Sequence, residues 1–187
     1  MTKKPIINLI IDTLIMVLLI IGDQYTKALA VWNLKEKNAI SLISGVLELN
    51  YLENRGAAFG MLQNQKWFFM FVALLVLGCI VYILMKAPTE KRYIVLHLLL
   101  TFIAAGAIGN MIDRVMLGYV VDFIYFKLIN FPIFNVADIY VTCATFLLII
   151  VLLFVYKEND LKFMSFHPDK YRILDDTSKN GEDENDR

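Results

Sequence analysis

Long apolar stretches separated by short polar ones dominate the chain. Four of them, at residues 6–30, 67–85, 93–112 and 137–156, have the length that a helix needs to cross a hydrocarbon core roughly 30 Å thick, about 20 residues. The pattern predicts an all-α integral membrane protein with four transmembrane helices.

The longest connection, residues 31–66, has a different pattern. Its segments 40–43 and 46–51 are rich in strand-forming residues on either side of Ser44-Gly45, a dipeptide typical of a hairpin turn. We expect a small β-sheet at the membrane surface, within this first outer loop. The small residues that follow, including Gly56, permit either a close backbone approach or a plain surface turn.

Basic residues predict the orientation of the four spans. Lys3 and Lys4 precede the first span, and Lys86, Lys91 and Arg92 crowd the connection between the second and third. The positive-inside rule therefore places both termini in the cytoplasm and the longer loops outside. Basic residues within the first outer loop weaken this contrast.

The first apolar stretch carries polar residues on one side. Asp12 and Asp23 are 11 positions apart and so fall within about 20° of each other on a helix, with Asn8 and Lys27 near the same side. Such a stripe should face other helices. Two alternatives stay open: Asp12 lies hydrated near the cytoplasmic interface, or the stretch is a cleaved signal peptide, which its charged residues disfavour.

Composition adds three limits. The chain has 187 residues, 58% of them hydrophobic, with 18 basic and 18 acidic residues, which suits one membrane domain and gives no net charge that favours nucleic acid. Cys79 and Cys143 lie in apolar runs where buried free thiols are common, and are poor candidates for a disulfide or a metal pair. Residues 161–187 read as an acidic, disordered cytoplasmic tail after a membrane domain of residues 1–160.

Three aspartates in or beside the apolar stretches are the first candidates for chemistry. A charged side chain inside a bilayer costs on the order of 2.5–3.5 kcal/mol even on insertion scales. Asp113 shares a helix face with Asn110 and Arg114, although an Asp–Arg pair there could simply snorkel to the interface. Asp138 lies three residues after Asn135, in the first turn of the last predicted helix, where capping alone would explain both.

Capping does not explain Asp122, which stands in an apolar run between the third and fourth spans. The aspartates belong to short blocks: DQYTK at 23–27, NRGAAFG at 54–60, GNMIDR at 109–114, VDF at 121–123 and FNVAD at 134–138. In this order, on a four-span layout, the blocks resemble the bacterial lipoprotein signal peptidases, also called signal peptidase II.

The resemblance implies an aspartic endopeptidase of the bacterial cytoplasmic (inner) membrane, with its active site at the outer face. Such an enzyme removes signal peptides from prolipoproteins by cleaving before a diacylglyceryl-modified cysteine, and we expect it to work as a monomer among membrane lipids without nucleic acid, cofactor or metal. The implied catalytic residues are Asp122 and Asp138. Positions that match the family's substrate site are Asn54, Asn110, Asp113, Arg114 and Asn135, and supporting positions are Asp23, Lys27, Gly56 and Phe59. Ile139 departs from the small hydroxyl residue that is frequent there.

Two carboxyls can hydrolyse a peptide bond when one is ionised and the other protonated, a state that close approach in a low dielectric favours. The histidines, His97 and His167, show no metal-ligand spacing. A Ser–Lys nucleophile built from Ser41 or Ser44 and Lys66 has no supporting spacing.

Two other function classes remain as alternatives. A small proton- or cation-coupled transporter would use Asp12, Asp23 and Asp113 as a relay, and would need carboxylates spread through the depth of the membrane. A structural membrane subunit would not need the blocks.

Overall fold

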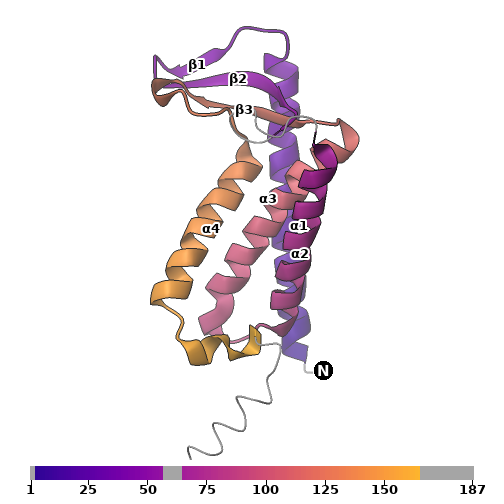
Figure 1. Ribbon diagram of the computed structural model, residues 1–187, viewed down its shortest axis with the longest axis vertical. Coiled ribbons are helices and arrows are strands. Elements are labelled where there is room, and N and C mark those ends of the chain that lie inside the picture. Colours follow the sequence, from indigo (N-terminus) through magenta and orange to yellow (C-terminus); the bar gives the residue numbers. More distant parts are fainter. Residues whose placement is uncertain (1–2, 57–64, 165–187) are drawn as a thin grey trace, which may run out of the picture.

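The computed structural model describes residues 3–56 and 65–164. Its long helices are α1 (Lys3–Leu34), α2 (Lys66–Lys86), α3 (Ile94–Met116) and α4 (Val136–Phe154), which form a bundle with a sheet across one end (Figure 1). All four are long and apolar enough to cross a membrane. The predicted fold class is confirmed, although α1 and α3 extend several residues beyond the predicted spans. We call the two ends of the bundle the sheet end and the opposite end.

The sheet is antiparallel and has the order β1-β2-β3, formed by β1 (Ile40–Ile43), β2 (Leu47–Asn54) and β3 (Val120–Phe126). The predicted hairpin joins β1 to β2, with Gly45 at a φ of 72°. The prediction of a sheet confined to the first outer loop was incomplete, because β3 comes from the connection between α3 and α4. Leu52 pairs with Asp122, so the end of β2 lies beside a candidate catalytic residue.

Helix α3 is the centre of the bundle. Half of its membrane window is buried (50%), against 11% in each of the other helices. A Cβ added at Gly106 would lie 2.5 Å from the carbonyl oxygen of Ala137, and one at Gly109 would lie 2.5 Å from Oδ2 of Asp23. These two glycines therefore allow the start of α4 and the polar side of α1 to pack directly against α3.

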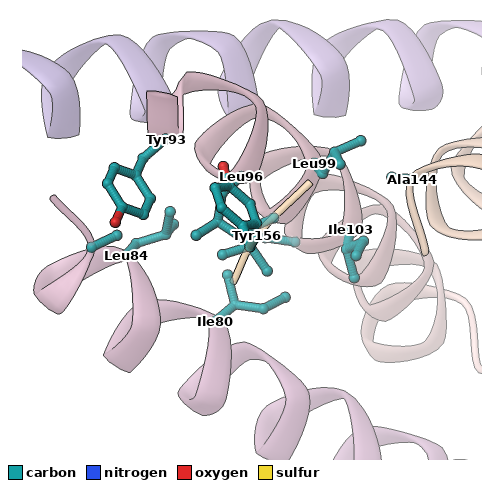
Figure 2. Close-up of a cluster of buried hydrophobic side chains, with 11 residues drawn as sticks. Ile80, Leu84, Tyr93, Leu96, Leu99, Ile103, Ala144 and Tyr156 are labelled. Atoms are coloured by element: carbon teal, nitrogen blue, oxygen red, sulfur yellow. The ribbon is translucent and has the colours of Figure 1, made fainter. Parts of the chain in front are cut away.

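An apolar cluster joins the helices at the opposite end (Figure 2). Tyr93 stacks on Tyr156 at 5.5 Å between ring centroids, and Phe163 packs edge-on against Tyr93 at 5.6 Å. Short 3-10 helices complete the connections: η2 (Lys91–Tyr93), η3 (Lys127–Ile129) and η4 (Glu158–Met164). The folded chain thus continues to the end of η4, and the remainder of the predicted tail lies outside the described residues.

The polar stripe of α1 faces inward as predicted, because Asp12, Asp23 and Lys27 are all buried. Oδ2 of Asp12 lies at hydrogen-bond distance, 2.7 Å, from Nδ1 of His97 on α3. Asp12 is therefore buried between helices and does not lie hydrated at the interface. The expected burial of the cysteines was wrong: Cys79 and Cys143 are free and exposed. An apolar neighbourhood in sequence does not separate core from outward-facing positions when a helix is apolar all round.

Candidate active site

The two predicted catalytic aspartates open into one cavity of about 560 Å³ at the sheet end of the bundle. Asp122 comes from β3 and Asp138 from the first turn of α4. Among the described residues, the other polar lining residues are Asn54, Arg114 and Thr142. The rest of the wall is mainly apolar and comprises Gly56, Phe69, Phe131, Pro132, Ile133, Phe134, Ile139 and Cys143.

Asp122 is buried and receives two amide donors. The Nδ2 of Asn54 donates to its Oδ2 at 2.8 Å, and the Nδ2 of Asn135 donates to its Oδ1 at 2.6 Å. Burial disfavours the charged carboxylate, and the charge of Asp138 adds to this, so that the pKa of Asp122 rises to about 7. A carboxyl of this kind can hold a proton near neutral pH.

Asp138 is held at the start of α4 by a capping box. Its backbone N–H donates to Oδ1 of Asn135 at 3.0 Å, while the N–H of Asn135 donates to Oδ2 of Asp138 at 3.1 Å. The Nδ2 of Asn110 on α3 donates to the other oxygen at 2.8 Å. The capping explanation is therefore correct but partial, because Asn135 contacts both aspartates at once.

Lys27 connects α1 to this site through residues that surround the two candidate aspartates, without lining the cavity itself. Its buried ammonium lies 2.9 Å from Oδ2 of Asp23, 3.1 Å from Oδ2 of Asp113 and 2.9 Å from Oδ1 of Asn110. Three acceptors match the three N–H donors of an ammonium. Removal of one partner from a buried ion pair typically costs 3–5 kcal/mol, so this group also holds α1 against α3.

The two supporting carboxylates each hold the backbone next to a candidate catalytic residue. Asp23 accepts the N–H of Ala137 at 2.9 Å, and Asp113 accepts the N–H of Val121 at 3.0 Å. Ala137 and Val121 immediately precede Asp138 and Asp122. The network around Lys27 therefore positions both aspartates through their own backbones.

The snorkelling alternative supposed an ion pair between Arg114 and Asp113, but the structure does not show this pair. The guanidinium of Arg114 lies over the ring of Phe69 at 4.8 Å and donates to the carbonyl oxygens of Gly56 at 3.5 Å and Asn110 at 3.4 Å. Gly56 is buried, which favours the close-approach reading over a plain surface turn.

One polar residue of the network was missed. The Nε2 of Gln24 donates to Oδ1 of Asp113 at 3.0 Å, to the carbonyl oxygen of Gly109 at 3.2 Å and to Oδ2 of Asp23 at 3.2 Å. Its place in the DQYTK block was the only signal in the sequence. Phe59, predicted as a supporting residue, lies outside the described residues, whereas all the other predicted site residues meet here.

Within residues 3–56 and 65–164, no group of three or more His, Cys, Asp or Glu side chains is arranged to hold a metal ion. His97 lies with Asp12 between α1 and α3, apart from the cavity and its lining residues.

Comparisons with known proteins identify the family of this chain. The family model described as signal peptidase (SPase) II matches residues 15–154. A lipoprotein signal peptidase of Streptococcus thermophilus (strain CNRZ 1066) is 48% identical over 137 residues, covering 73% of this chain and 88% of that protein. One of Clostridioides difficile (strain 630) is 45% identical over 141 residues, covering 75% and 93%.

A solved structure, described as a bacterial membrane enzyme determined by the in meso method at 2.3 Å resolution, has a similar fold. Its TM-score is 0.68 at 34% identity, and the match covers 79% of this chain and 92% of that one. The family match begins within α1, continues to the end of α4 and includes every candidate site residue described above. The chain belongs to the signal peptidase II family.

Proposed function

We propose that this protein is an aspartic endopeptidase that removes signal peptides from prolipoproteins, cleaving before the diacylglyceryl-modified cysteine. The observation that carries the proposal is the convergence of two carboxyls, the buried Asp122 and the partly buried Asp138, on one largely apolar cavity, with Asn135 contacting both. The family relatives named lipoprotein signal peptidase support the choice of substrate.

The reaction needs one proton on the pair. The ionised carboxylate takes a proton from water while the water oxygen attacks the scissile carbonyl carbon, and the protonated carboxyl gives its proton to the carbonyl oxygen. The carboxyl that took the proton from water then gives it to the leaving nitrogen. As the C–N bond of the tetrahedral intermediate breaks, the other carboxylate takes a proton from one hydroxyl of the intermediate, and the pair again holds one proton. The raised pKa of Asp122 supports such a one-proton state near neutral pH.

The walls of the site suit a lipidated peptide. Phe69, Phe131 and Ile139 give an apolar lining beside the carboxyls, and a second hollow of about 260 Å³ between α2, α3 and α4 adjoins Asp138 and Arg114. Asn54 lines the cavity, whereas Asn110 and Asn135 support the site by donating hydrogen bonds to the carboxyls. Asp113 acts through the backbone and Lys27. The carboxyls supply acid and base themselves, so the mechanism requires no metal.

Basic residues at the opposite end support the proposed orientation in the membrane. Lys86 ends α2, and Lys91 and Arg92 lie in η2, in the connection at the end of the bundle away from the sheet (Figure 1). The positive-inside rule puts that end in the cytoplasm. The site then faces the outer side of the membrane, where an exported precursor would present its cleavage point. The transporter alternative loses support because Asp23 and Asp113 are both paired with Lys27.

The test is cleavage by the purified protein in lipid bicelles. A precursor peptide with a diacylglyceryl cysteine should be cut immediately before that cysteine, as read by mass spectrometry, and the same peptide without the lipid should be cut far more slowly. Absence of cleavage of the lipidated peptide, or equal rates for both peptides, would contradict the proposal.

A further inference from the structure

Three asparagines surround the candidate dyad, and the orientation of each side-chain amide decides whether a carboxyl meets a donor or an acceptor. Amide oxygen and nitrogen are assigned from their hydrogen-bond partners. Partners that can only donate therefore settle the orientation, because they must face the amide oxygen.

Two of the asparagines are oriented by the backbone. Oδ1 of Asn135 accepts the N–H of Asp138 at 3.0 Å, and Oδ1 of Asn54 accepts the N–H of Gly56 at 3.0 Å. Each therefore turns its NH2 group toward Asp122. These orientations belong to the fold itself.

Asn110 is different, because its main orienting partner is a side chain. The ammonium of Lys27 donates to Oδ1 of Asn110 at 2.9 Å, and the Nδ2 of Asn135 adds a longer contact at 3.1 Å. The Nδ2 of Asn110 then faces Oδ1 of Asp138 at 2.8 Å. The atoms form a chain in which each donor polarises the next: ammonium, amide, carboxyl.

For Asp138, we expect the hydrogen bond from Lys27 to Asn110 to matter more than the long-range charge of Lys27. Asp23 and Asp113 both lie within ion-pair distance of the ammonium, so two negative charges already offset its long-range field. Lys27 is not among the described residues that line the cavity. Besides the backbone contacts that Asp23 and Asp113 make, the route from Lys27 to the carboxyl of Asp138 runs through the amide of Asn110.

We propose that Lys27 is a positioning residue that acts on Asp138 through the amide of Asn110 and so favours the dyad with one ionised carboxyl. The inference rests on the proposed function and deepens it. Without the ammonium, the longer contact from Asn135 is the remaining described donor to the oxygen of Asn110. The amide can then turn this oxygen toward Asp138, which needs a proton to make the contact. The base form of the dyad becomes harder to reach at a given pH.

The pH dependence of kcat/KM tests this route, because it reports the ionisation of the free enzyme. Lys27→Met should move the acidic limb upward by about one pH unit or more and lower kcat more than it changes KM. Lys27→Arg, which keeps a donor, should restore part of the shift. Lys127→Met removes an exposed ammonium paired with Glu48 and should leave the profile unchanged.

The decisive comparison is made in an Asn110→Ala background. If Lys27 acts through the amide, Lys27→Met should add little further shift to Asn110→Ala, since the two residues belong to one chain of contacts. A shift of equal size with and without the Asn110 amide would overturn the proposal, because it would show a direct effect of charge.

A second measurement tests the inference without relying on cleavage activity. Infrared titration of the protonated-carboxyl band, assigned to Asp138 by subtraction of Asp138→Asn, should show that band persisting to higher pH in Lys27→Met, whereas an unchanged titration would contradict the inference. If Lys27→Met unfolds, its combination with Asp113→Asn removes one charge of each sign and is titrated instead, with the same two outcomes. If the wild-type protein cleaves nothing while Lys27→Met still shows the band shift, only the proposed function is rejected.

Discussion

At the scale of residues, most contacts of the candidate dyad come from groups that donate hydrogen bonds. Asn54 and Asn135 donate to Asp122, while Asn110 and the backbone of Asn135 donate to Asp138. Donors favour negative charge, whereas burial and mutual repulsion oppose it. The balance suits a pair that carries one proton, and the proton belongs to the pair as a whole.

The pH dependence of cleavage should reveal that shared proton. The pKa of Asp122 is raised to about 7, so the pair loses its proton as the pH rises through neutrality. Because the mechanism needs that proton on the scissile carbonyl, kcat/KM should fall above about pH 7. Rates measured with a peptide that does not titrate in this range check the prediction, and a rate that keeps rising well above neutral pH would contradict it.

Sequence patterns predicted the members of this site better than their partners. Asp23, Asp113 and Lys27 were each singled out, but their mutual contacts depend on the register of α1 against α3, which local periodicity does not encode. Gln24 was missed for the same reason. His97 was examined only as a metal ligand, since nothing in the sequence connects it with Asp12, 85 residues away.

At the scale of elements, the contact of α3 with the start of α4 sets the position of Asp138. Gly106→Ala would place a Cβ 2.5 Å from the backbone of Ala137, and overpacking of this kind costs about 1–3 kcal/mol. We expect lower thermal stability together with a loss of cleavage.

Gly78→Ala on α2 is the matched control, because nothing described lies within 4 Å of its added Cβ. Its stability and activity should equal those of the wild type. Melting curves and cleavage rates for both variants check the pair, and wild-type behaviour of Gly106→Ala would mean that the close approach of α3 and α4 is wrong.

The last described element, η4, suggests where the chain can be shortened. Phe163 packs on Tyr93, and Asp160 pairs with Arg92. Truncation after Met164 should leave stability and activity near wild type, since the acidic remainder offers little apolar surface. Truncation after Lys157 should lower the free energy of unfolding by roughly 2 kcal/mol, from the lost burial of Phe163. Thermal unfolding of both truncations decides, and equal stability would show that η4 contributes nothing.

The helices were predictable because each needs a long apolar run, and their ends differed from prediction by only a few residues. The strand β3 was not predictable from its own sequence, because its first four residues are all buried. A short run without apolar–polar alternation does not distinguish a buried strand from a helical segment. Pairing with β2, far away in sequence, decides the outcome.

At the scale of the whole molecule, the account requires the sheet end to lie outside the cell. Reporters fused after Gln63 and near Leu128 should be external, and one near Lys91 internal, because basic residues flank the opposite end. A reporter after Lys157 provides a second internal position. The opposite result would be activity at Lys91, and none near Leu128, of a reporter that works only outside the cell. It would invert the orientation and place both aspartates on the cytoplasmic side.

The central claim is that Asp122 and Asp138 act as one unit, and single-turnover cleavage of a diacylglyceryl peptide tests it most directly. Asp122→Asn and Asp138→Asn should each abolish cleavage while the protein still inserts, and the double variant should be scarcely worse than either, because residues that act as a unit are not additive. Asp113→Asn, which acts through Val121 and Lys27, should lose activity only in part. Substantial cleavage by Asp122→Asn or Asp138→Asn, or complete loss in Asp113→Asn alone, would contradict the assignment.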